Sequence, residues 1–191
     1  MYICEGLVLN LPPENKPWNV TSNIMSTHRT KDTYQKQIYE FIKDIYVVCP
    51  NCGEKAIVKT DEVLFRNIDE SKIKLICSQC GYNKRLKEMP TGIHFSGNNE
   101  NIISRYFIIG GTIDPYFQQT LWLTNKCGEN ILWAYNYEHL EFLERHVEAK
   151  LRERNIESIE NKSLGSRLPK WMTSKKNREL VLKVIKQLKE K

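Results

Sequence analysis

The 191-residue sequence has no long apolar run and only six cysteines. No stretch approaches the roughly 18–20 apolar residues that a membrane-spanning helix needs. The first residues also lack the basic leader and the small-residue cleavage site of a secretory signal peptide. We therefore expect a cytoplasmic protein that does not enter a membrane. In that compartment thiols stay reduced, and clustered cysteines bind metal instead of forming disulfides.

Catalytic signatures are missing as well. The sequence contains no Gly-rich phosphate loop, no motif that joins a nucleophile to a base, and no motif of paired carboxylates. His139 and His146 are seven residues apart and share one face of a predicted helix, but no third metal ligand accompanies them at a usual spacing. We interpret both as satisfied or solvent-facing side chains. The protein is accordingly predicted not to be an enzyme.

Four of the six cysteines stand in two matching Cys-x-x-Cys-Gly units, CPNCG at 49–53 and CSQCG at 77–81. Two cysteines separated by two residues can direct both sulfurs at one ion, and the glycine after them lets the backbone curl back toward the thiolates. Two such turns on separate hairpins complete a tetrahedron, and matching glycines disfavour the alternative of buried or redox-active cysteines. The predicted zinc ligands are Cys49, Cys52, Cys77 and Cys80.

Cys127 also precedes a glycine, but it has no Cys-x-x-Cys partner. We interpret it as a small residue in a hairpin turn. It is not included in the predicted metal site.

This cysteine pattern resembles the zinc-ribbon family, of the kind found in transcription factor IIB and in RNA polymerase and replication proteins. The resemblance covers residues 47–89 and implies one structural Zn²⁺ in a closed Cys₄ site, which holds together a small β fold that is unfolded without metal. It does not imply a function, because ribbons dock on proteins as well as on nucleic acid. The stretch 163–188 resembles the tails of bacterial zinc-ribbon proteins, and this resemblance implies no activity.

The remaining patterns predict an α+β protein. Residues 1–30 are irregular or disordered, with Met25 as an alternative start, and 31–48 have the three-and-four apolar spacing of a helix whose last residues run on as a strand. Short alternating runs on either side of residues 61–71 predict strands within a ribbon at 49–89. Turn formers predict a linker at 90–104.

Residues 105–191 are expected to form a small C-terminal domain of a β-hairpin plus helices. RYFIIGG at 105–111 reads as a buried strand that Gly110 and Gly111 stop, and the hairpin turns at Gly128, which can adopt a positive φ. Asn136 caps an acidic helix over 137–154, a shorter helix runs over 158–168, and Thr173 or Ser174 caps a last helix with an apolar stripe.

Aromatic residues are dense in the same domain. We expect most of them to fill the core, with one or two exposed and able to stack on bases. They are Tyr106, Phe107, Tyr116, Phe117, Trp122, Trp133, Tyr135 and Tyr137.

Positive charge is concentrated near the C-terminus. The net charge is +6, and residues 161–191 hold ten basic residues against two acidic ones. A basic surface of this kind attracts phosphate, although an apolar stripe opposed by lysines also describes an ordinary solvated helix. The predicted nucleic-acid contacts are Lys84, Arg85, Lys87, Arg167, Lys170, Lys175, Lys176 and Arg178.

Together these patterns predict a non-catalytic, zinc-binding protein that is nucleic-acid-associated or regulatory, with nucleic acid or a protein of the nucleic-acid machinery as partner. The alternative is a protein-binding adaptor or inhibitor, for example one that is immunity- or antitoxin-like. In that case the acidic helix 137–154 would bind a basic protein, and the lysines would serve solubility only.

Overall fold

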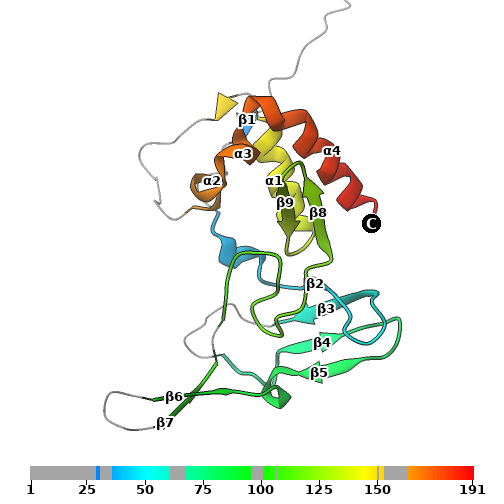
Figure 1. Ribbon diagram of the computed structural model, residues 1–191, viewed down its shortest axis with the longest axis vertical. Coiled ribbons are helices and arrows are strands. Elements are labelled where there is room, and N and C mark those ends of the chain that lie inside the picture. The colour runs from blue at the N-terminus through cyan, green and yellow to red at the C-terminus, as the bar shows by residue number, and fades with distance from the viewer. Residues whose placement is uncertain are drawn as a thin grey trace, which may run out of the picture.

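The structure is a computed structural model that describes residues 29–30, 36–60, 68–95, 101–105, 107–149, 151–152 and 163–191. It contains both helices and strands, as an α+β protein should. A four-stranded sheet lies at one end of the long axis, and helices with a β-hairpin lie at the other (Figure 1). Near the helices, β1 (Arg29–Thr30) pairs in parallel with β10 (Leu151–Arg152). In the described part of the chain, no helix has the length and apolar content needed to cross a membrane.

The four-stranded sheet is antiparallel throughout and follows chain order. Its first three strands alternate between buried and more exposed side chains, which is the period-two pattern of a half-buried sheet. This confirms the strands predicted on either side of 61–71. The strands are β2 (Ile45–Val48), β3 (Lys55–Lys59), β4 (Lys74–Ile76) and β5 (Asn83–Arg85).

The helix predicted over 31–48 is wrong in its described part. Residues Ile38–Phe41 form only a short 3₁₀ helix, η2, and Ile45–Val48 form β2, which confirms the predicted strand before the first cysteine. Asp44 between them adopts a positive φ of 48°, which no α-helix accommodates. The outer edge of β2 is occupied by distant partners, because its backbone forms hydrogen bonds with Thr120, Trp122 and Tyr135. These tertiary hydrogen bonds outweigh the helical periodicity; residues 31–35 lie outside the described residues.

The linker predicted at 90–104 contains a β-hairpin, made of β6 (Gly92–Phe95) and β7 (Asn101–Ser104). Arg105 follows this hairpin and ties it to the sheet. Its guanidinium donates to both carboxylate oxygens of Glu70, at 2.9 and 3.0 Å, and to three carbonyls of the segment 86–90 that contains η3 (Leu86–Glu88).

The C-terminal hairpin is formed as predicted, from β8 (Leu123–Cys127) and β9 (Asn130–Ala134), with Gly128 at a φ of 63°. The side chain of Asn136 accepts a 2.9 Å hydrogen bond from the N–H of His139 and so caps the following helix α1, as predicted. That helix spans Tyr137–Glu148 and ends earlier than the predicted residue 154, because Ala149 has left helical geometry with a ψ of 114°.

The buried strand predicted in RYFIIGG is not formed over its described residues 107–109. Gly110 and Gly111, which were predicted to stop it, do have positive φ values, of 94° and 118°. The N–H of Gly110 donates to the hydroxyl of Tyr135 instead of to a neighbouring strand, and Ile108 is 52% exposed.

Short helices complete the C-terminal end. The predicted helix at 158–168 is reduced in its described part to one turn, and the last helix begins after a 3₁₀ turn with Asn177, not Thr173 or Ser174, at its N-cap. These elements are α2 (Leu164–Arg167), α3 (Lys170–Thr173), η5 (Lys175–Asn177) and α4 (Arg178–Lys189).

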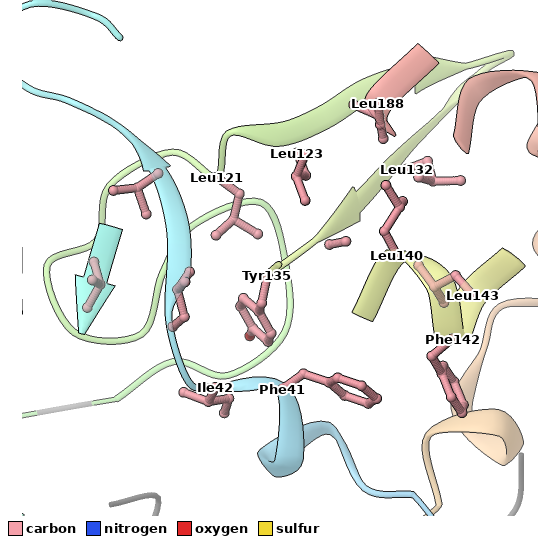
Figure 2. Close-up of a cluster of buried hydrophobic side chains, with 14 of the residues drawn as sticks. Phe41, Ile42, Leu121, Leu123, Leu132, Tyr135, Leu140, Phe142, Leu143 and Leu188 are labelled. Atoms are coloured by element: carbon pink, nitrogen blue, oxygen red, sulfur yellow. The ribbon is translucent and has the colours of Figure 1, made fainter. Parts of the chain in front are cut away.

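One apolar core links the sheet to the helices. Figure 2 shows Leu123 and Leu132 of the hairpin facing Leu140 and Leu143 of α1, with Leu188 of α4 above them. All five are at most 1% exposed. Burying a leucine side chain contributes about 1.5–3 kcal/mol, so this cluster holds α1, α4 and the hairpin together. From η2 the core continues through Phe41 and Ile42 to the interior side of β2 (Figure 2).

Candidate metal centre

The two cysteine turns are built in the same way at the ends of two strands. Cys49 follows β2 and Cys77 follows β4, and each accepts a 3.0 Å hydrogen bond at its carbonyl from the glycine four residues later. Those glycines, Gly53 and Gly81, have φ values of 77° and 74°, a conformation that other residues rarely adopt. The predicted role of the two glycines in curling the backbone is therefore confirmed.

The four predicted ligands meet at one point. Their sulfur atoms all lie within 4.8 Å of one another. The distance is 3.7 Å between the sulfurs of Cys49 and Cys80, and again 3.7 Å between those of Cys52 and Cys77. A zinc ion with Zn–S bonds of about 2.3 Å requires neighbouring sulfurs about 3.8 Å apart in a tetrahedron. The cluster therefore has the size of a tetrahedral Cys₄ metal site.

Two of the four thiols, Cys80 and Cys52, have pKa values shifted in opposite directions. Hydrogen bonds from the Asn51 side chain and from the backbone of Tyr82 lower the pKa of the Cys80 thiol to about 6. The backbone of Glu54 stabilises the Cys52 thiolate, but burial and the hydrogen bonds to the other three sulfurs raise the pKa of Cys52 to about 12. Four thiolates this close repel one another, and a bound divalent cation removes that repulsion.

Two ligands are buried and two are exposed. Cys49 and Cys77 are 2% and 1% exposed, whereas Cys52 and Cys80 reach the surface. Four protein sulfurs fill the coordination shell of a tetrahedral ion, which is the arrangement of structural zinc sites. A tetrahedral ion bound to these four cysteines would cross-link the two turns.

The predicted nucleic-acid contacts are divided between two places. Lys84, Arg85 and Lys87 lie on β5 and η3, while the other five lie on α2, α3, η5 and α4. The two groups are at opposite ends of the long axis (Figure 1). The structure therefore does not bring them together into one surface. The second group, Arg167, Lys170, Lys175, Lys176 and Arg178, is called the C-terminal basic surface below.

Among the described residues, no acid forms a salt bridge with any of the five cations of the C-terminal basic surface. Arg178 is half-buried and donates to the carbonyl of Ala149 at 3.4 Å, while the other four are exposed. Their charge is therefore directed into solvent.

The acidic helix α1 differs in this respect. Glu138 pairs with Lys36 at 3.1 Å, and Glu144 pairs with Lys189 on α4. Glu141 and Glu148 remain exposed on its outer face. Half of its glutamate row is thus neutralised within the chain.

The two histidines of α1 are core residues. His139 and His146 are 2% and 1% exposed, so the solvent-facing alternative is wrong, and the metal group found in the described residues does not include them. His139 stacks on Phe41 with ring centres 4.8 Å apart, and burial lowers its pKa to about 3. Cys127 is 2% exposed at the end of β8, consistent with a small hairpin residue.

A cavity of about 410 Å³ lies among η2, β9, α1 and the α2–α3 segment. Its walls include Tyr39, Trp133, His139, Arg167 and Trp171. Sequence reasoning did not predict it. The cavity could not be predicted from the sequence, because its lining residues come from five separate segments. The one local signal was the position of Trp171 among basic residues.

Comparison with known proteins provides no relative for this chain. It matches no protein-family model, no curated protein and no solved structure. The resemblance of residues 47–89 to zinc ribbons is supported in part, since the four clustered cysteines fit a zinc-ribbon-like site.

Proposed function

We propose that the chain is a non-catalytic nucleic-acid-binding protein whose four-cysteine site holds one structural Zn²⁺. The sulfur spacing and the two glycine turns support zinc, because Cys₄ tetrahedra of this size are typical structural zinc sites. Cys49, Cys52, Cys77 and Cys80 would hold the ion. It would supply a cross-link between the β2–β3 and β4–β5 turns and no reaction chemistry.

The observation that carries nucleic-acid binding is the unneutralised charge of the C-terminal basic surface. Four of its cations are exposed, and none pairs with a described acid. The field of such a surface attracts polyanions and raises their association rate. A merely solvated helix would be expected to mix both signs, whereas residues 161–191 hold ten basic residues and two acidic ones.

The alternative of a protein-binding adaptor is less well supported. It requires α1 to offer its acidic row to a basic partner, but Glu138 and Glu144 already pair with Lys36 and Lys189. Unless it broke these pairs, a basic partner could form ion pairs only with the two remaining glutamates, Glu141 and Glu148. The basic surface meets no such obstacle.

Binding to single-stranded and double-stranded nucleic acid at several salt concentrations tests this proposal. For ~4 phosphate contacts we expect a log–log slope of affinity against salt of about −3 to −4. The double variant Lys175→Glu/Lys176→Glu should weaken binding at least tenfold near 50 mM salt and reduce the slope by about 1–2.

The double variant Lys43→Glu/Lys126→Glu is the matched control. It changes the net charge equally, and both lysines are exposed outside the basic surface. Its affinity should stay close to that of the unmodified protein. Equal losses in both variants, or no binding to any nucleic acid at low salt, would contradict the proposed function.

A further inference from the structure

We propose that the cavity beside the C-terminal basic surface binds one unstacked nucleobase of a nucleic-acid strand, with the adjoining phosphate against Arg167 and Lys170. This inference rests on the proposed function and deepens it, because it names a base-binding pocket within that function. The observations that carry it are the aromatic walls of the cavity, one buried hydrogen-bond donor, and the positive charge at its rim.

The walls suit a planar ring. Trp133 on β9 and Trp171 on α3 both line the cavity and are both half-buried. The ring contacts of Trp133 are with Tyr135 and His139, at 5.2 and 5.6 Å between ring centres, and among the described residues none joins it to Trp171. Tyr39 adds a third aromatic side chain that is 41% exposed. Aromatic side chains with open faces are the usual platform for unstacked bases.

The cavity also has the size of a ligand site. Its volume of about 410 Å³ falls within the range of roughly 300–1,000 Å³ typical of small-molecule pockets. Most other lining side chains are aliphatic, such as Leu143, Leu164 and Met172. A base therefore finds an apolar environment large enough to hold it.

His139 lines the cavity and would supply a hydrogen-bond donor to the base. Its Nδ1 accepts the backbone N–H of Tyr135 at 3.3 Å, which leaves the proton of the neutral ring on Nε2. Burial lowers the pKa of His139 to about 3, so the ring is neutral near pH 7. A neutral N–H group can donate a hydrogen bond to a carbonyl oxygen or ring nitrogen of a base. It carries no charge that would draw a phosphate into the cavity.

The negative charge of the ligand belongs at the rim. The described lining includes one cation, Arg167, and no acidic residue. Arg167 is exposed, and Lys170 follows it on α3. From there the basic surface continues through Lys175 and Lys176 on η5, which favours a polymer with successive phosphates over a single small anion.

A comparison of two strands with equal charge tests the pocket. One is a single strand of about 12 mixed nucleotides, and the other is an abasic phosphodiester strand of the same length. We expect the abasic strand to bind about tenfold more weakly with nearly the same salt slope, because it keeps the phosphates and lacks the base. Equal affinity for the two strands would overturn the pocket and leave the proposed function standing. Failure of both strands to bind at low salt would overturn both.

Tryptophan fluorescence locates the base. Binding of the mixed strand should quench part of the emission, and the variant Trp171→Phe should lose part of this quenching while keeping most of the affinity. Trp171→Ala should lower the affinity for the mixed strand toward that for the abasic strand. Trp122→Phe is the control, since Trp122 is not among the described lining residues. This substitution should change the quenching and the affinity only slightly. Quenching that depends on Trp122 and not on Trp171 would contradict this assignment.

Discussion

The backbone N–H of Tyr46 donates a 2.8 Å hydrogen bond to the carbonyl of Tyr135. The carbonyl of Tyr46 accepts a second hydrogen bond, 2.9 Å long, from the N–H of Trp122. Through these bonds, strand β2 is part of the cysteine-bearing sheet and is also joined to the residues that flank the β8–β9 hairpin. The first cysteine of the candidate metal centre, Cys49, directly follows β2. Backbone hydrogen bonds of β2 therefore connect this site to the rest of the fold.

We predict that chelation of the metal unfolds the sheet and changes the environment of Trp122. Apparent binding energies of about 10–16 kcal/mol for structural zinc exceed or match the stability of about 5–15 kcal/mol of a whole domain. Limited proteolysis should therefore show new cuts within residues 49–89, together with altered circular dichroism and tryptophan emission. An unchanged digestion pattern and spectrum after complete metal removal would refute this prediction.

Elemental analysis of cysteine variants provides the matched control for that experiment. Cys52→Ser should reduce the metal content well below one ion per chain, whereas Cys127→Ser should keep one ion. Cys127 lies at the end of β8, and the four-cysteine group does not contain it.

Substitution of the turn glycines should weaken the site through the backbone alone. An added Cβ at Gly53 or Gly81 meets nothing within 4 Å, so the cost comes from the positive φ. We expect Gly53→Ala to lose about 1–2 kcal/mol of unfolding free energy and Gly53→Asn to lose less, because asparagine tolerates the left-handed region better. Urea denaturation of the zinc-loaded protein measures both. Equal stability of the alanine variant and the unmodified protein would show that this conformation is not required.

Arg105 should contribute more stability than the other ion pairs. Its side chain is 10% exposed and contacts Glu70 and three carbonyls, whereas the Lys59–Asp44 pair, 3.9 Å apart, is well exposed. We expect Arg105→Ala to lose about 3 kcal/mol in urea denaturation, because it removes the cation that pairs with the partly buried carboxylate of Glu70 and the donor to the part-buried carbonyl of Met89. Lys59→Ala should change stability by no more than about 1 kcal/mol. Comparable losses in the two variants would contradict the difference inferred from their burial.

The buried ring of His139 should make stability depend on pH. Its pKa is about 3 in the folded chain and 6.5 in an exposed histidine, so the unfolded chain binds this proton first as the pH falls. The contribution of His139 to the free energy of unfolding is therefore full above about pH 6.5 and is lost at about 1.4 kcal/mol per pH unit between 6.5 and 3.

Two measurements check this pH dependence. The stability difference between the unmodified protein and His139→Gln should shrink from pH 7 to pH 5, because only the unmodified protein binds a proton at this position when it unfolds. Zinc release affects both proteins alike and cancels in the difference. NMR of the ring nitrogens should show a neutral His139 with its proton on Nε2 throughout that range. A ring that titrates near pH 6.5 would contradict the burial argument.

Features encoded within a few neighbouring residues were predicted correctly. The clustering of the four cysteines follows from Cys-x-x-Cys-Gly because one turn and one glycine direct both sulfurs. The cap at Asn136 and the turn at Gly128 are equally local, since each depends on one side chain or one φ angle. Such signals survive in any tertiary context that leaves the turn intact.

The helix predicted ahead of β2 was wrong for a physical reason. Apolar side chains at Phe41, Ile42 and Ile45 satisfy helical spacing, yet all three also reach the core from a 3₁₀ turn followed by a strand. The hydrogen bonds that decide between these conformations come from residues 120, 122 and 135, far along the chain.

The amino-acid sequence by itself thus determined the four clustered cysteines, the two glycine turns that carry them and the excess of positive charge near the C-terminus, because short-range geometry and composition specify them. Only the tertiary structure decided where the two basic groups lie and that half of the acidic row on α1 is already paired. It alone also assembled the cavity around Trp133, His139 and Trp171. Contacts of this kind depend on how distant segments pack, and no local pattern records that packing.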